Sequence, residues 1–282
     1  MHGMLREPVT HFTLSKSMIW RKYLLLYFVF AASVVDAGTL SKAQAAYEQK
    51  NYASAYTQFS SLQGEESGRA CYYLGVMNQQ GCGIIADPAK AAVFYECAGE
   101  KSHIKALHNL AGLYHRGLGV PQDLDKALEL YRRSAGQGGA KAAHRLGLIY
   151  FQGDGVPRDF VLAREWWQKA FERGEADSGY NLGILHRRGL GIARDQIRAL
   201  QLWMEAGALG SAHAQNAYGS ALMKAEGIAY NPIQAYAWFR AAAVAGLPVA
   251  RTNAELVWES LPPDAQEKAL TEADALITSF QK

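Results

Sequence analysis

The chain has 282 residues, of which 49% are hydrophobic and 20% are charged, and its formal net charge is +3 at pH 7. Of its 29 basic and 26 acidic residues, four and two lie within residues 1–37, which leaves a nearly neutral remainder of 25 and 24. This balance argues against wholesale nucleic-acid binding, and the content of Leu, Ala, Trp and Tyr is enough to build a core without a metal.

The N-terminal segment has the features of a secretory signal peptide. Arg21 and Lys22 precede an apolar run of 13 residues, 23–35, which is shorter than the about 20 residues that span a bilayer. Ala37 ends a cleavage-like sequence, and Met18 is an alternative start to Met1. We therefore expect residues 1–37 to form an N-terminal extension and signal peptide cleaved near Ala37, with no integral membrane span afterwards. The expected location is a bacterial periplasm or the exterior, and a retained signal anchor is the alternative.

The rest of the chain is organised by a 36-residue repeat. One pair of adjacent residues recurs at this interval in five places, and these are Leu74-Gly75, Leu110-Ala111, Leu146-Gly147, Leu182-Gly183 and Tyr218-Gly219. A small residue, a glycine pair, an Asp or Asn, an alanine and an apolar-aromatic pair keep the same phase in each unit. A constant period of this length predicts an array of stacked supersecondary units.

Each unit is predicted to be a helical hairpin. In the third unit, Ala142, Leu146 and Tyr150 are spaced by four residues and share one helix face. Gly153 ends this first helix, because glycine readily adopts the left-handed conformation found at helix C-termini. Asp159 is the predicted N-cap of the second helix. A single hairpin cannot bury its apolar face alone, so the units must stack on one another.

The pattern A-x-x-x-L-G-x-x-Y-x-x-G-x-G-V, followed by Asp and K-A-x-x-x-Y, is carried by residues 106–131. It resembles the Sel1-like repeat family, which is related to tetratricopeptide repeats. The resemblance implies an all-α fold, a right-handed α/α solenoid of helix-turn-helix repeats with helical caps. The predicted units are 70–105, 106–141, 142–177, 178–213 and 214–249. Residues 38–69 are a predicted degenerate capping repeat, and residues 250–282 are predicted capping helices.

The three cysteines, Cys71, Cys82 and Cys97, all lie in the first full unit. In an oxidising compartment two of them can pair, and Cys71 with Cys97 is the natural choice because the helices of a hairpin pack about 8–10 Å apart. Some Sel1-like proteins staple each repeat with a disulfide, but their spacing is not clearly reproduced here. Buried thiols, with Cys82 in a loop, are the alternative.

No motif for catalysis, a cofactor or a metal is present. The glycine pairs follow helices rather than strands, so they are turn residues and not a phosphate loop. His108 and His144 occupy one column of successive units, about 10 Å apart, whereas zinc needs nitrogen ligands near 2 Å. Ser134, Ser178, Ser211 and Ser220 lack the surroundings of an activated nucleophile. We expect a protein that is not an enzyme and has no cofactor.

The resemblance to tetratricopeptide arrays implies that the first helix of each unit lines a concave face. The residues expected there carry one acid, Asp177, and an excess of basic and aromatic side chains, which suits an acidic protein partner. The predicted partner-binding residues are Arg69, Tyr72, Lys105, His108, His115, Arg116, Lys141, His144, Phe151, Tyr180, Arg187, Arg188, His213, Asn216 and Lys224. An ordinary solvated face is the alternative.

The predicted function is that of a non-enzymatic, exported scaffold that captures another protein. Roles in the Sel1-like family imply two more specific alternatives. One is an immunity protein that neutralises a secreted toxic effector such as a type VI secretion lipase, and the other is an assembly factor for the envelope, flagellum or polysaccharide export. A β-lactam-binding or hydrolysing enzyme is a further alternative from a different class.

Overall fold

The computed structural model describes residues 38–63 and 66–280, which contain helices and turns and no strands. The predicted signal peptide, with Met18 and the cleavage point at Ala37, lies outside these residues. The described chain divides after Lys101 into two compact units. Within the part that the structure describes, no helix is both long and apolar enough to cross a membrane.

The first unit holds a short N-terminal hairpin and the first full repeat. Residues 38–48 are helical, and α2 (Tyr52–Ser61), α3 (Ser67–Gln80) and α4 (Pro88–Glu100) follow. Ala55 and Phe59 of α2 are buried in a cluster with Leu74 and Met77 of α3. The short hairpin therefore covers the apolar side of α3, as expected for a capping repeat.

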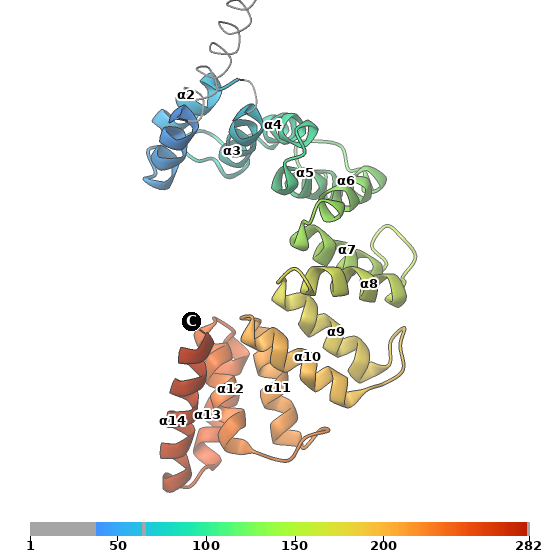
Figure 1. Ribbon diagram of the computed structural model, residues 1–282, viewed down its shortest axis with the longest axis vertical. Coiled ribbons are helices and arrows are strands. Elements are labelled where there is room, and N and C mark those ends of the chain that lie inside the picture. The colour runs from blue at the N-terminus through green and yellow to red at the C-terminus, as the bar shows by residue number, and fades with distance from the viewer. Residues whose placement is uncertain (1–37, 64–65, 281–282) are drawn as a thin grey trace, which may run out of the picture. The chain divides into compact units, whose positions relative to one another are not determined.

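The second unit contains four further hairpins followed by two more helices (Figure 1). The first helices are α5 (Ile104–Arg116), α7 (Ala140–Gln152), α9 (Ala176–Arg188), α11 (Ala212–Lys224) and α13 (Pro248–Ser260). The second helices are α6 (Leu124–Gly136), α8 (Phe160–Phe171), α10 (Gln196–Ala208) and α12 (Pro232–Val244), and α14 (Pro263–Phe280) ends the described chain. Helices α7, α9 and α11 each pack against the second helix of their own hairpin and against that of the preceding one, whereas α13 and α14 both pack against α12. The fold is an all-α solenoid, as the sequence predicted.

Helix boundaries follow the residues that predicted them. Gly153 adopts φ +76° at the C-terminus of α7. Asp159 then caps α8, with its Oδ1 accepting hydrogen bonds from the backbone N–H groups of Val161 and Leu162, each at 2.9 Å. Ala225 takes the corresponding left-handed position in the fifth repeat at φ +53°, where other repeats have glycine. The turn geometry is therefore kept even where the preferred residue is missing.

The repeated glycine and aromatic columns form the contact inside each hairpin. The indole of Trp167 in α8 lies over Gly147 of α7, and its Nε1 donates to the His144 carbonyl oxygen at 3.2 Å. Trp203 lies over Gly183 in the next hairpin and donates to the Tyr180 carbonyl oxygen at 3.1 Å. Both indoles are about 1% exposed. The glycine column thus allows a large ring to approach the backbone of the first helix.

Candidate protein-binding face

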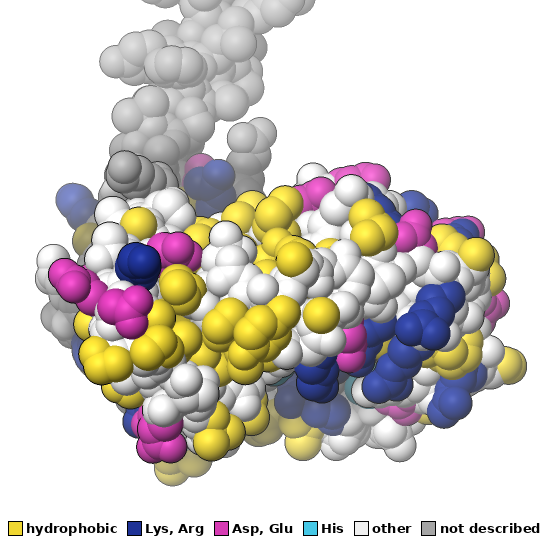
Figure 2. Space-filling model, turned by 90° about the horizontal axis from the view of Figure 1, so that it is seen from below, with side chains coloured by type: hydrophobic (Ala, Val, Ile, Leu, Met, Phe, Trp, Pro, Cys, Tyr) yellow, Lys and Arg dark blue, Asp and Glu magenta, His cyan; other side chains and the backbone are white. Residues whose placement is uncertain are grey.

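The first helices of the second unit present basic side chains at matching positions. Lys105 and Arg116 are exposed on α5, and Lys141 is exposed on α7 in the same column as Lys105. Arg188 on α9 and Lys224 on α11 share the column of Arg116 and are also exposed. Figure 2 shows one face of the molecule, on part of which several Lys and Arg side chains lie side by side among hydrophobic and uncharged ones.

Two of these cations and the exposed Arg145 of α7 form what we call the basic cluster: Arg116, Lys141 and Arg145. Their charges act on the ring pair of His108 and Tyr131, whose centroids are 5.5 Å apart. Burial, together with the smaller effects of the Arg145 and Lys141 charges, lowers the pKa of His108 to about 4. Burial raises the pKa of the Tyr131 hydroxyl, against the opposing effect of Arg145 and Arg116. His108 is therefore neutral at physiological pH, and the positive charge of this region comes from the three longer side chains.

Arg145 was missed by the sequence prediction. It lies four residues after Lys141, so the two side chains share one face of α7. The spacing alone is a sufficient signal, but the column of Arg145 holds Asn109 in the preceding repeat and Asn181 in the following one. A comparison of columns for basic residues therefore passes over it.

Cations of this face outnumber the carboxylates near them. Within residues 38–63 and 66–280, no carboxylate lies within 4 Å of the side-chain nitrogens of Lys105, Arg188, Lys224 or any member of the basic cluster. Glu175 is close enough for the charge of Lys141 to lower its pKa, although burial has the larger effect and raises it. The acid at the edge of α9 thus offsets part of the charge of Lys141 without forming an ion pair.

Two predicted partner-binding histidines join adjacent hairpins instead of standing free. His115 Nε2 on α5 lies 2.9 Å from Asp154 Oδ2, in the loop after α7. His144 Nδ1 on α7 lies 2.7 Å from the Ser178 hydroxyl on α9, and burial lowers the pKa of His144. Each contact links a side chain to the repeat that follows, so these residues contribute to stacking.

Two predicted partner-binding residues of α9 and α11, Arg187 and Asn216, also contact neighbouring parts of the array. The Arg187 guanidinium lies 3.7 Å from Glu226 and 5.3 Å from the ring centroid of Trp203. Asn216 Oδ1 on α11 accepts a hydrogen bond from Asn253 Nδ2 on α13 at 2.8 Å. Arg187 and Asn216 are both half-buried. The exposed surface that they were predicted to provide is therefore smaller than the sequence suggested.

Asp177, the acid of this face, is held by its neighbours at the N-terminus of α11. Its Oδ1 accepts a hydrogen bond from the Ser211 hydroxyl at 2.6 Å and lies 3.9 Å from His213 Nδ1. His213 is exposed, and its ring is 5.5 Å from that of Tyr180. These contacts partly neutralise the α9 and α11 region. The surplus of positive charge is accordingly strongest on α5 and α7.

Phe151 contributes to the core more than to a binding surface. Its ring is 5.4 Å from Phe160 and 5.3 Å from Trp167, and the side chain is half-buried. In the first unit, Tyr72 is also half-buried, with its ring near Tyr73 and Tyr95. Arg69 is exposed, 3.9 Å from Glu66.

The four serines that lack the sequence surroundings of a nucleophile make structural contacts or lie in the core. Ser134, Ser178 and Ser211 are at most 3% exposed. The Ser134 hydroxyl donates to the Ile104 carbonyl oxygen, and the Ser220 hydroxyl donates to that of Asn216, both at 2.9 Å. In the described ranges, no group of three His, Cys, Asp or Glu side chains is placed to hold a metal ion.

The cysteines of the first unit are now placed. Cys71 on α3 and Cys97 on α4 form a disulfide, with 6.1 Å between their Cα atoms. Cys82 is a free, half-buried thiol in the turn after α3. The sequence left open a Cys71–Cys97 disulfide and buried free thiols, and the structure contains the disulfide.

Comparison with known proteins agrees with this architecture. The Sel1 repeat family matches residues 68–103, 104–139, 140–175, 176–211 and 212–247. The chain belongs to the Sel1 repeat family. The matched units have the predicted 36-residue phase, and each starts two residues before the unit predicted from the sequence. No curated protein matches the chain.

Two solved Sel1-type structures are similar to this chain. A Sel1 repeat protein from Oxalobacter formigenes has a TM-score of 0.71 at 25% identity and covers 83% of this chain and 96% of its own. A protective antigen present in uropathogenic Escherichia coli strains has a TM-score of 0.72 at 28% identity, covering 87% of this chain and 55% of its own. An immunity protein from Pseudomonas aeruginosa has a TM-score of 0.48 at 21% identity, covering 77% of this chain and 84% of its own. The chain is a Sel1 repeat scaffold, a type of fold that serves protein–protein interaction.

Proposed function

We propose that this protein is a non-enzymatic, exported scaffold that binds a partner protein with an acidic surface through the first-helix face of its second unit. The observation that carries the proposal is the basic cluster, in which three exposed cations act on one ring pair and no carboxylate is within 4 Å of them in the described part of the chain. Uncompensated charge of one sign on a surface steers partners of the opposite sign and accelerates their association.

The structure also changes which residues test the proposal. Arg187 contacts Glu226 and Trp203, so reversing its charge would disturb the packing of two repeats as well as the surface. Arg145 is exposed, and no ion pair to it is found among residues 38–63 and 66–280. The sharper variant therefore combines Arg116→Glu, Lys141→Glu and Arg145→Glu. Exposed charges of this kind contribute little to folding stability, so the variant is expected to fold.

The experiment is a crosslinked pull-down from the exported fraction of the source organism, analysed by mass spectrometry. The matched control reverses three exposed cations outside the first-helix face, with Arg133→Glu, Arg194→Glu and Lys268→Glu, so both variants change the net charge equally. We expect one dominant protein that is captured by the wild type and the control and lost from the basic-cluster variant. Equal capture by both variants would show that the face is not the interface.

The identity of the captured protein distinguishes the more specific roles. A toxic effector would support the immunity function, and an envelope, flagellar or polysaccharide-export component would support an assembly function.

A β-lactamase role is tested directly with nitrocefin, and turnover above that of a heat-treated sample would contradict the non-enzymatic proposal. The buried serines described above support the expectation of no turnover.

The disulfide supports the exported location. Disulfides persist mainly in oxidising compartments, and Cys71 and Cys97 are bonded here. N-terminal sequencing of the protein recovered from the cell envelope tests the proposal, with a start near residue 38 as the expected result. Recovery of an uncleaved chain from the cytosol would contradict export.

A further inference from the structure

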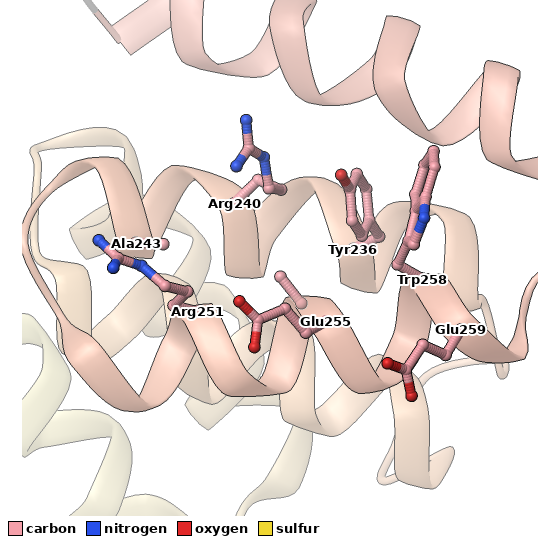
Figure 3. Close-up of a pocket in the computed structure, with 8 residues that line it drawn as sticks. Tyr236, Arg240, Ala243, Arg251, Glu255, Trp258 and Glu259 are labelled. Atoms are coloured by element: carbon pink, nitrogen blue, oxygen red, sulfur yellow. The ribbon is translucent and has the colours of Figure 1, made fainter.

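A second site lies between α12 and α13, on helices that do not carry the basic cluster. It is a cavity of about 220 Å³. Tyr236 and Arg240 of α12 line it together with Arg251, Glu255 and Trp258 of α13 (Figure 3). In that view the charged side chains of Arg240, Arg251 and Glu255 lie toward one end, and the two rings lie toward the other.

This site exists because α13 departs from the repeat pattern. Glu255 stands 36 residues after Gly219, in the column where glycine accepts an aromatic ring from the second helix of the hairpin. The residue that should supply this ring, 36 after Phe239, is Ala275. Helix α14 instead packs mainly against α12, where Ala269 and Ala273 are buried. The face of α13 that would carry a second helix is therefore open, and Glu255 is exposed on it.

Arg251 is also unusual in its column. The residues at this position in the three preceding repeats, Ala143, Gly179 and Gln215, are all buried. Arg251 is exposed, and so is Arg240 on the facing helix. In the described part of the chain, no ion pair involves Arg240, Arg251, Glu255 or Glu259. Two guanidinium groups, Arg240 and Arg251, and two carboxylates, Glu255 and Glu259, thus line one small cavity, with no ion pair between them.

The other end of the cavity is aromatic. The rings of Tyr236 and Trp258 are 5.2 Å apart and inclined by 36°. Tyr236 is 6% exposed, whereas Trp258 is half-buried. The pair offers a fixed apolar surface on which a planar group can pack. The cavity is smaller than the roughly 300–1,000 Å³ of sites for drug-sized ligands, so its ligand is expected to be smaller than those.

We propose that this pocket binds a ligand that carries an α-carboxylate next to an aromatic side chain, with a free aromatic amino acid as the best match. The carboxylate binds Arg240 and Arg251, because the guanidinium group forms paired hydrogen bonds with carboxylates. The ligand ring packs against Tyr236 and Trp258. The α-ammonium group faces Glu255, which gives that carboxylate the charge partner that it lacks. The C-terminal residue of a peptide supplies the same carboxylate and ring but no ammonium group.

The test is isothermal titration calorimetry of the full mature chain with three probes. L-phenylalanine has both charged groups, N-acetyl-L-phenylalanine keeps the carboxylate alone, and L-phenylalaninamide keeps the ammonium group alone. We expect the free amino acid to bind most tightly, the N-acetyl form more weakly, and the amide not measurably. Equal binding of the first two would assign the site to peptide C-termini and would overturn the role of Glu255. An absence of binding for all three at several millimolar would overturn the proposal.

Variants separate this site from general charge effects. Arg240→Gln and Arg251→Gln are each expected to weaken the binding of L-phenylalanine about tenfold or more, as expected for loss of a charge-assisted hydrogen bond. Arg194→Gln, an exposed arginine in the loop before α10, removes the same charge and should leave affinity unchanged. Glu255→Gln should weaken the binding of the free amino acid but not the binding of its N-acetyl form. Unchanged affinity in Arg251→Gln, with helix content intact by circular dichroism, would refute the site.

This proposal and the one for the basic cluster fail independently. The pocket variants leave Arg116, Lys141 and Arg145 in place, so protein capture should persist in Arg251→Gln. Conversely, the basic-cluster variant should bind L-phenylalanine like the wild type. Loss of amino-acid binding in the basic-cluster variant would indicate a nonspecific charge effect and would count against the pocket.

Discussion

Replacing Gly183 by alanine tests the contact that holds each hairpin together. A Cβ atom at this position would lie 2.2 Å from Nε1 and 2.6 Å from Cδ1 of Trp203. The indole cannot easily move aside, because it is 1% exposed and its Nε1 donates to the Tyr180 carbonyl oxygen. The added methyl group must therefore displace either the ring or the whole second helix.

Three effects set the size of the change in stability. Overpacking a core typically costs about 1–3 kcal/mol, and loss of the indole hydrogen bond adds about 0.5–1.5 kcal/mol. Against this, alanine is favoured over glycine in a helix by about 1 kcal/mol. The net loss is about 2 kcal/mol in the middle of this range, which lowers the melting temperature of a chain of this size by about 4–8 °C. Thermal unfolding followed by far-ultraviolet circular dichroism measures it.

Other positions in the chain supply a control for the Gly183→Ala variant and a second substitution that should compensate for it. Gly112 is a helical glycine whose Cβ would meet nothing closer than the Tyr131 hydroxyl at 3.6 Å, so Gly112→Ala should leave stability unchanged or raise it. The second repeat already combines Ala111 with Tyr131 in the columns of Gly183 and Trp203. The double variant Gly183→Ala/Trp203→Tyr should therefore be more stable than the sum of its single changes predicts. A melting temperature of Gly183→Ala at or above that of the wild type would refute this account of the glycine column.

Three other predictions follow from local features. Ala225→Gly should raise the free energy of unfolding by up to about 1 kcal/mol, because Ala225 has φ +53°, and a lower melting temperature would contradict this. Replacing Cys71 and Cys97 by serine should cost about 2–4 kcal/mol in urea unfolding, and a reducing agent should destabilise the wild type but not the variant. For His108, burial lowers the pKa from 6.5 to about 4, so the unfolded chain takes up the proton first as the pH falls. Stability on the order of 3 kcal/mol is therefore lost between pH 6.5 and 4, and His108→Gln should show a flatter pH dependence of the unfolding free energy than the wild type.

Much of the fold was predictable because the repeat displays the same physical requirement several times. A glycine such as Gly153 or a cap such as Asp159 is weak evidence alone, but its return every 36 residues fixes the phase of helices and turns. The core columns were equally clear, since a residue such as Leu146 must be buried wherever hairpins stack. Ala55 and Phe59 of the N-terminal hairpin also keep phase with Ala91 and Tyr95 of the first full repeat.

The binding face was predictable only in part, because periodicity gives the direction of a side chain and not its neighbour. His144 and Ser178 are 34 residues apart in the chain, and their contact depends on the spacing between two first helices. Arg187 and Glu226 meet for the same reason. A column therefore identifies which side chains project from one face of the first helices. The distance between stacked hairpins then decides whether those side chains are available to a partner or contact each other.

The last hairpin shows how far the column argument extends. Extending the glycine column by one period leads to Glu255, and extending the aromatic column leads to Ala275. A carboxylate cannot replace glycine beneath a buried ring without losing its solvation, and alanine cannot fill the volume of a ring. These two substitutions already imply that α14 cannot pack on α13 as α12 packs on α11. The helix contacts α12 instead, where Phe280 lies 5.6 Å from Trp238, and the face of α13 stays open. A break in the columns of a repeat protein therefore locates a helix face that no neighbouring helix of the array covers. Such a face is accessible to a ligand.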